Sequence, residues 1–142
     1  MAAAGEDEPQ LRLVLTGGGH EEGAAQPGVE VRGLVSGEEL GSLYRRTACL
    51  VFPSLYEGFG QPPLEAMASG SPVAASNIPA LAEACGDAAA LFEPTDPEDI
   101  AAVVSGVLDA PERFAAAGPE RARAFTWAET ARRHEAVYRS IV

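Results

Sequence analysis

Lysine is absent from this 142-residue sequence, and all ten basic residues are arginines. Because 21 residues are acidic, the chain carries a formal net charge of −11. Proteins that bind nucleic acid neutralise its phosphates with clusters of lysine and arginine, so this composition argues against DNA or RNA as a partner. The absence of lysine also removes one of the side chains that commonly bind phosphate groups.

Cysteine is scarce, and long apolar runs are missing. Cys49 and Cys85 stand alone among small apolar residues without metal-ligand spacing, which predicts buried free thiols. His20 and His134 have no partner in the sequence, and we assign neither a direct role. No stretch reaches the roughly 20 apolar residues of a membrane span, and the N-terminus lacks the pattern of a signal peptide. We therefore expect a soluble, cytoplasmic protein without a metal site.

Short apolar runs alternate with helical segments along a chain that is about one domain long. Since no hairpin signal separates the runs, the predicted fold class is α/β, with a parallel, doubly wound sheet flanked by helices. Pro111 and Pro119 should each open a helix, and Thr126 with Glu129 should cap the last one. The other expected strands are 11–15, 29–34, 49–52, 73–75 and 88–92, and the other expected helices are 36–46, 63–69, 79–86 and 96–108.

The last helix carries an amphipathic stripe whose members recur every three or four residues: Trp127, Ala131, His134, Tyr138 and Ile141. The apolar side chains of such a stripe need a surface to pack against. We expect it to cover the chain's own sheet, and docking onto a partner domain is the alternative.

The segment from Glu57 to Ala66 follows the third expected strand directly. Ligands of open parallel sheets bind outside the carboxyl ends of the strands, which is where this loop should lie. Gly58 and Gly60 let the main chain approach a ligand closely. The helix expected to start at Pro63 then directs free N–H groups and its positive dipole end at the same space. Together these features predict a site for a diphosphate.

Glu57 and Glu65 lie on either side of this predicted anion site, Glu57 before the glycines and Glu65 in the first helical turn. Carboxylates accept hydrogen bonds from hydroxyl groups, and a nucleotide sugar has hydroxyls at both ends of its diphosphate. A simpler interpretation stays open, in which Glu65 interacts only with the helix dipole and Glu57 is merely solvated.

The run from Val51 to Val73, VFPSLYEGFGQPPLEAMASGSPV, resembles the signature of the group 1 glycosyltransferases, also called glycosyltransferase family 4. The similarity extends from about Leu11 to the end of the chain. Further matching segments are Val31–Ser36, Gly86–Ala89, Pro94–Pro97 and Phe125–Trp127.

The resemblance implies the C-terminal, Rossmann-like half of a GT-B enzyme, which holds the donor and transfers its hexose with retention and usually without a metal. It implies that Glu57, the catalytic residue, approaches the transferred sugar, and that Glu65 binds the ribose hydroxyls. The backbone of Gly58, Phe59 and Gly60 and the N–H of Leu64 would contact sugar and diphosphate. The turn formed by Arg32, Gly33 and Leu34 would lie against the base of UDP or GDP.

Two parts that the family normally has find no match in this sequence. One is an earlier strand and loop with an Arg and a Lys that neutralise the diphosphate, and the other is the N-terminal acceptor-binding domain. We therefore interpret residues 1–10 as an acidic leader and residues 11–142 as an incomplete nucleotide-sugar-binding domain, and we expect this fragment alone to be inactive.

Two other functions compete with this interpretation. The first is a non-catalytic module that derives from the same fold and binds a nucleotide or a protein. The second is a dinucleotide-dependent oxidoreductase, which needs a Gly-x-Gly-x-x-Gly turn that opens a helix. The segment after Gly17–Gly19 is rich in Gly and Pro up to Gly28 and does not open a helix.

Overall fold

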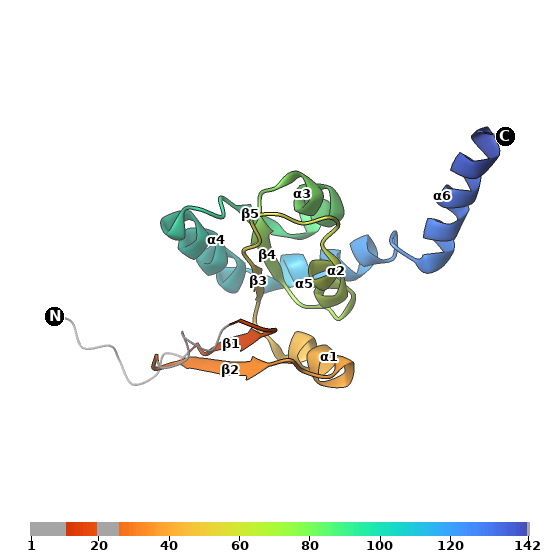
Figure 1. Ribbon diagram of the computed structural model, residues 1–142. Helices are drawn as coiled ribbons and strands as arrows, with labels where there is room; N and C mark the ends of the chain where they lie inside the picture. The colour runs from red at the N-terminus through yellow and green to blue at the C-terminus, as the bar shows by residue number, and fades with distance from the viewer. Residues whose placement is uncertain (1–10, 20–25, 142) are drawn as a thin grey trace. The chain divides into compact units, whose positions relative to one another are not determined.

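A computed structural model describes residues 11–19 and 26–141 (Figure 1). The predicted leader at residues 1–10 and His20 lie outside these residues. The chain divides into two compact units, residues 1–40 and 41–142. In chain order the elements are β1 (Leu13–Thr16), β2 (Val29–Gly33), α1 (Gly37–Arg46), β3 (Leu50–Phe52), α2 (Gln61–Ala68), β4 (Val73–Ser76), α3 (Pro79–Cys85), the 3-10 turn η2 (Gly86–Ala88), β5 (Ala90–Phe92), α4 (Pro97–Asp109), α5 (Pro111–Ala122) and α6 (Trp127–Ser140).

The first unit contains a pair of parallel strands, β1 and β2, with Leu13 opposite Val29. After β1 the chain turns through glycines, and the Gly17 N–H donates to the Gly33 carbonyl at 2.8 Å. At the start of α1 the Glu39 N–H donates to the Ser36 hydroxyl oxygen at 3.2 Å. This contact makes Ser36 a side-chain cap of α1.

The second unit is built on a parallel sheet in the order β3-β4-β5. All four residues of the central strand β4 are buried, and three of them are Val or Ala. Side chains this small let helices pack close to both faces of the sheet. A strand buried on both faces is typical of parallel sheets that are covered by helices.

Helices cover the two faces of this sheet, α4 on one side and α2 with α3 on the other (Figure 1). Because side chains alternate along a strand, Ala74 points to the face opposite that of its neighbours in β4. It packs there with Phe92, Val107 and Phe114 in the main apolar cluster. The β3-β4-β5 sheet is thus covered by helices on both faces.

Every strand pair is parallel, as the sequence predicts. Strands β1 and β2 pair within the first unit, and β3, β4 and β5 pair within the second. Parallel strands flanked by helices confirm the predicted α/β fold class.

Helix α2 begins at Gln61, two residues earlier than predicted. Gly60 precedes it in the left-handed region with φ of 95°, a conformation that glycine adopts without strain. Pro62 and Pro63 occupy the first helical turn, where their fixed φ suits a helix and their missing N–H groups cost little.

Pro119 does not open a new helix, contrary to the prediction, because it lies inside α5. A proline inside a helix removes one hydrogen bond, and packing can compensate for this loss. Here the preceding residue, Gly118, is buried directly against Met67 of α2. This close packing of α5 on α2 favours a continuous helix through Pro119.

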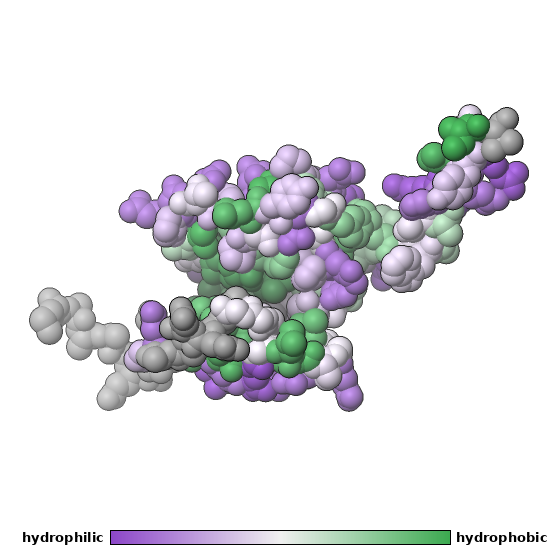
Figure 2. Space-filling model, viewed as in Figure 1, coloured by the Kyte–Doolittle hydropathy of each residue, from purple (hydrophilic) through white to green (hydrophobic). Residues whose placement is uncertain are grey.

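Helix α6 does not cover the chain's own sheet, so that prediction was wrong. It has no buried residue, and Trp127 is 86% exposed. Both faces of the β3-β4-β5 sheet are already covered by other helices. Hydrophobic side chains stay visible near the C-terminal end of α6 (Figure 2), where Val137, Tyr138 and Ile141 are exposed. Docking onto a partner domain stays a prediction.

No helix of the described residues combines the length and the apolarity that crossing a membrane requires.

Candidate donor site

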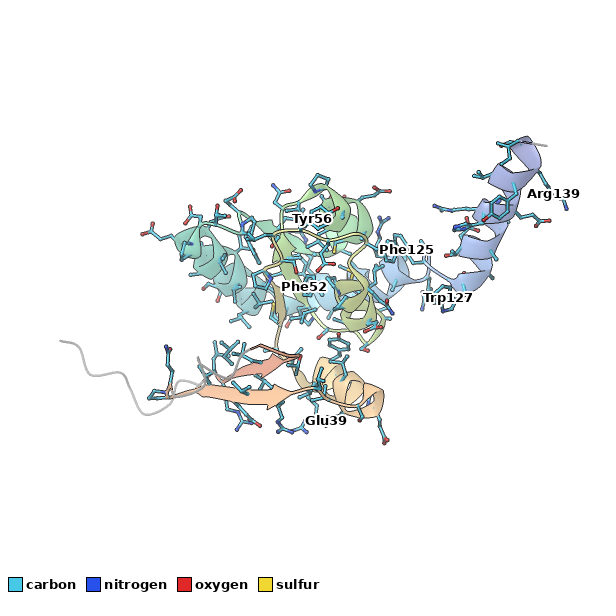
Figure 3. All side chains as sticks on the ribbon, in the orientation of Figure 1. Glu39, Phe52, Tyr56, Phe125, Trp127 and Arg139 are labelled. Carbon is cyan, nitrogen blue, oxygen red and sulfur yellow. The ribbon has the colours of Figure 1, made fainter. Side chains whose placement is uncertain are left out.

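The candidate site is built around the loop between β3 and α2, residues 53–60. The loop leaves the carboxyl end of β3, which confirms its predicted place at the edge of a parallel sheet. Tyr56, labelled in Figure 3, is 89% exposed, and Leu55 is exposed as well. The loop therefore presents both apolar and acidic side chains to solvent.

Glu57 is held by a residue of its own loop. The Ser54 hydroxyl donates to Glu57 Oε1 at 2.8 Å, and both side chains are partly buried. A hydrogen bond to a carboxylate restricts the orientation of the acid. Ser54 thus orients the acid that the sequence singles out as catalytic.

Glu65 lies in the second turn of α2, since that helix begins at Gln61. The prediction that it belongs to the first helical turn was wrong, and an interaction with the helix dipole alone does not explain its place. The Gln61 amide donates to Glu65 Oε1 at 3.0 Å, and the Tyr44 hydroxyl donates to Oε2 over a longer distance of 3.5 Å. Both carboxylate oxygens therefore have a neighbour that orients them.

Tyr44 is buried at the end of α1, where its backbone carbonyl accepts a hydrogen bond from the Ser71 hydroxyl at 2.8 Å. Burial, together with the negative charge and the hydrogen bond of Glu65, raises the pKa of its phenol to about 12. The phenol is therefore neutral at physiological pH and can act as a donor to Glu65.

The N-terminus of α2 offers fewer backbone donors than a typical helix start. Pro62 and Pro63 have no N–H, so only Gln61 and Leu64 can donate within the first four positions. The Leu64 N–H is 3.5 Å from the Gly60 carbonyl, a long hydrogen bond. A ligand oxygen could therefore compete for this N–H with little loss.

The two glycines of the loop occupy different environments. Gly58 is exposed, and a Cβ added to it would meet nothing within 4 Å. Gly60 is buried, and an added Cβ would lie 2.5 Å from Leu81 Cδ2. The positive φ and this close packing explain Gly60 without any ligand, whereas the open space beside Gly58 suits close approach by a ligand.

Phe59 lies between these glycines and is about half exposed. Its ring meets the ring of Phe125 edge to face, with centroids 5.7 Å apart. Arg121 lies over the other aromatic partner, with its Cζ atom 5.0 Å from the Phe125 ring centroid. A segment close to the end of the chain thus contacts the glycine loop.

The turn predicted to face the base belongs to the first unit. The Arg32 side chain is paired there with Glu30 and Glu39, its Nη1 lying 3.0 Å from Glu39 Oε1. Hydrogen bonds to these two carboxylates raise the pKa of Arg32, so its charge is permanent but largely neutralised. Gly33 has φ of 62°, and Leu34 is 90% exposed, which leaves an apolar side chain free to contact a ligand.

Sequence reasoning missed the residues that orient the acids and the loop. Gln61 could have been found, because it precedes Glu65 by four residues and so shares a face of the helix. Ser54 is close to Glu57 in the chain, but only the turn brings their side chains together. Tyr44 and Phe125 are far from their partners in sequence, and no local pattern predicts their contacts.

Both cysteines are free thiols, as predicted, with Cys85 fully buried and Cys49 partly buried. Burial raises the pKa of each thiol to about 11. Within residues 11–19 and 26–141 no three His, Cys, Asp or Glu residues are grouped to hold a metal ion. That the reaction needs no metal stays a prediction.

An open hollow of about 410 Å³ lies elsewhere in the second unit, between η2 and α5. Asp87, Glu120 and Arg121 line it together with alanines, and it contains none of the predicted donor-binding residues. We do not associate it with the donor.

Comparison with known proteins identifies the family of this chain. A family model described as "Glycosyl transferases group 1" matches residues 2–110. This chain belongs to the group 1 glycosyltransferases. The O-antigen chain mannosyltransferase B of Escherichia coli is 39% identical to it over 125 residues, a match that covers 86% of this chain and 31% of the relative. The chain thus spans about a third of the length of that glycosyltransferase.

Solved glycosyltransferases share the fold. Sucrose-phosphate synthase from Thermosynechococcus elongatus matches 86% of this chain and 32% of its own, with a TM-score of 0.73 and 30% identity. The C-terminal domain of a group 1 glycosyltransferase from Francisella tularensis matches 72% of this chain and 55% of its own, with a TM-score of 0.59 and 28% identity. An Anabaena protein in complex with UDP and glucose matches 82% and 36% at 19% identity, with a TM-score of 0.68. The fold is that of the C-terminal half of a GT-B glycosyltransferase.

Proposed function

We propose that this chain binds the nucleotide diphosphate sugar of a retaining glycosyltransferase that transfers a hexose to an acceptor. The observation that carries the proposal is the pair of oriented carboxylates in a group 1 glycosyltransferase fold. Glu57 lies before the start of α2 and Glu65 lies within it, and each accepts a hydrogen bond from a neighbour. Two acids around a helix N-terminus suit a ligand with hydroxyls at both ends and a diphosphate between them.

Glu65 is the residue that we assign to the ribose. Gln61 and Tyr44 donate to its two oxygens, and each carboxylate oxygen can accept a second hydrogen bond. Vicinal ribose hydroxyls could use this remaining capacity. Glu57 is the catalytic residue of the proposal, and it approaches the transferred sugar from the loop, with Ser54 fixing its orientation.

The diphosphate is assigned to main-chain groups. Gly58, Phe59 and Gly60 supply backbone contacts to sugar and phosphate, and the weakly engaged N–H of Leu64 donates to a phosphate oxygen. In the first unit the turn from Arg32 through Gly33 to the exposed Leu34 is assigned to the base of UDP or GDP.

The sugar is a hexose, for which mannose is the first candidate, since the Escherichia coli relative is named a mannosyltransferase. A nucleotide donor is supported by the Anabaena protein of the same fold, which holds UDP and glucose. The acceptor needs a second, N-terminal domain, since this chain matches only about a third of its relatives' length. No metal is proposed for the transfer.

We expect the 142-residue chain by itself to bind donors weakly and to transfer nothing. The sequence has no Lys and a net charge of −11, so little positive charge offsets the diphosphate. The Arg and the Lys that the family normally has would each contribute about 1.5 to 3 kcal/mol to binding the diphosphate. Without these two contacts, a micromolar affinity moves toward millimolar. Transfer also requires that donor and acceptor be held together.

Ligand-observed NMR with UDP, GDP and ADP, beside a radiolabelled-sugar transfer assay, tests this proposal. We expect millimolar binding of UDP or GDP that Glu65→Gln weakens, with Glu112→Gln as the control for an exposed acid on α5. Binding that is equally strong in the Glu65 variant would contradict the assigned site. Several turnovers by residues 1–142 alone would contradict the need for a second domain.

A further inference from the structure

The glycine loop has few side chains that could hold it in shape. Of the residues from Glu57 to Gly60, two are glycines and one is the acid itself. Tyr56 before them is 89% exposed. Phe59 is therefore the side chain in this stretch that can anchor the loop by apolar contact.

The anchor for Phe59 comes from a distant part of the chain. Phe125, labelled in Figure 3, lies in the short connection between α5 and α6. Its ring packs on the Phe59 ring with centroids 5.7 Å apart and planes at 70°. Edge-to-face pairs of this geometry stabilise a structure beyond the burial of their surface.

Phe125 also packs against Arg121. The Arg121 guanidinium lies over the Phe125 ring, with 5.0 Å between the Cζ atom and the ring centroid. Arg121 Nε donates to the Ala84 carbonyl at 2.9 Å, and Nη2 donates to the carbonyl of Glu83, both near the end of α3.

These contacts form one continuous series from the end of α3 through Arg121 and Phe125 to Phe59. Each member is fixed by the one before it, because Arg121 binds rigid backbone carbonyls and Phe125 packs between a guanidinium and a ring. The shape of the loop beside Glu57 therefore depends on a residue that immediately precedes Thr126, the N-cap of α6.

We propose that Phe125 is a positioning residue for the donor: through Phe59 it holds the backbone from Gly58 to Gly60 in the conformation that receives a nucleotide diphosphate. This inference rests on the proposed function. Phe125 need not touch the ligand, and its effect passes through the ring of Phe59. An aromatic pair of this kind corresponds to a change of roughly 2- to 12-fold in an equilibrium constant.

The test compares Phe125→Ala, Phe125→Leu and Phe125→Tyr with the parent chain, and Tyr138→Ala is the control for an exposed aromatic residue on α6. Two quantities are measured, the hydrogen-exchange rates of the Gly58, Phe59 and Gly60 amides and the NMR-derived Kd for UDP and GDP. Thermal unfolding reports whether each variant is folded. If Phe125→Ala does not fold, Phe125→Leu takes its place, because it keeps the apolar volume but loses the ring.

We expect faster exchange at the three loop amides and a Kd raised roughly 2- to 12-fold in the Ala and Leu variants. Phe125→Tyr should restore both values, and Tyr138→Ala should match the parent. Unchanged Kd values in folded Ala and Leu variants, with or without faster exchange, would overturn the role of Phe125 and leave the proposed function intact. A parent chain that binds neither nucleotide would instead contradict the proposed function itself.

Discussion

Gly58 and Gly60 look alike in the sequence but do different things in the structure. Gly60 is buried with φ of 95°, and an added Cβ would clash with Leu81, whose side chain is fully buried and has no room to move. Gly58 is exposed with free space around it. A loss of binding at Gly60 would therefore not identify a ligand contact, whereas a loss at Gly58 would.

We predict that Gly58→Val keeps the fold and loses donor binding, because its side chain would fill the space that a ligand needs. Its unfolding free energy should stay within about 0.5 kcal/mol of the parent value. Gly60→Ala should lose about 2 kcal/mol or more from backbone strain and overpacking. Urea unfolding and ligand-observed NMR on both variants check this. A normal affinity in Gly58→Val would show that Gly58 only forms a turn and does not contact the ligand.

The two acids should separate in their effects on ligands. Glu65→Gln should weaken binding of free UDP or GDP by roughly 10- to 100-fold, the value of a hydrogen bond to a charged group. Glu57→Gln should spare the free nucleotide and weaken only the sugar-bearing donor, because Glu57 is assigned to the sugar. Competition NMR with both ligand types measures the difference. Equal losses of free nucleotide in the two variants would show that the division of roles is wrong.

At the scale of elements, the packing of α5 on α2 depends on a missing side chain. A Cβ on Gly118 would lie 3.2 Å from the backbone Cα of Met67, which cannot move aside as a flexible side chain could. Gly106, in the exposed part of α4, has nothing within 4 Å of its added Cβ. Replacing each of these two helical glycines by alanine therefore tests the same substitution at a tightly packed position and at an open one.

We predict that Gly118→Ala destabilises the chain by about 1 to 3 kcal/mol through overpacking. Gly106→Ala should stabilise it by about 0.5 to 1 kcal/mol, because alanine favours the helix and restricts the unfolded chain. Urea unfolding of the two variants under identical conditions gives both values. A shift of the same sign in both would mean that the contact with Met67 relaxes at no cost.

The positions of the strands and the parallel pairing could be predicted because short apolar runs and turn residues are local signals. The errors came from tertiary packing. Gly118 against Met67 keeps Pro119 inside α5, and Gly60 with Pro62 starts α2 before Pro63. The exposed stripe of α6 could not be assigned, because amphipathicity says that a face needs cover but not which surface provides it.

In the candidate site, the two acids and the glycines could be found from their spacing and from the family resemblance. The residues that orient them could be found only in part. Gln61 is one helical turn from Glu65, whereas Tyr44 and Phe125 reach their partners through the fold. Such long-range contacts carry no periodic signal that a single sequence reveals.

For the molecule as a whole, the buried thiols predict a loss of stability in alkali. Their pKa values rise from 9 to about 11 on folding, so the folded state favours the neutral thiol. This contribution is fully present below pH 9, where both states hold the proton. Above pH 9 the unfolded state ionises first, and the contribution is lost as the pH approaches 11.

We predict that the unfolding free energy falls between pH 9 and pH 11, by about 2 kcal/mol for the fully buried Cys85. Cys85→Ala should flatten this dependence, and Cys49→Ala should do so less because Cys49 is only partly buried. Urea unfolding under reducing conditions at several pH values measures the slopes. Parallel curves for the parent and the Cys85 variant would show that the thiol does not cause the loss.

The contact between Phe59 and Phe125 also has a consequence for the order in which the molecule assembles. Strands β3, β4 and β5 pair in the order of synthesis, with α2 and then α3 between them, so their contacts are local and can form quickly. Phe125 emerges only after α5, when the rest of its surroundings already exist. The β3-β4-β5 sheet can thus be complete while the loop from Glu57 to Gly60 still lacks its contact with Phe125, and we expect this loop to reach its final shape late in folding.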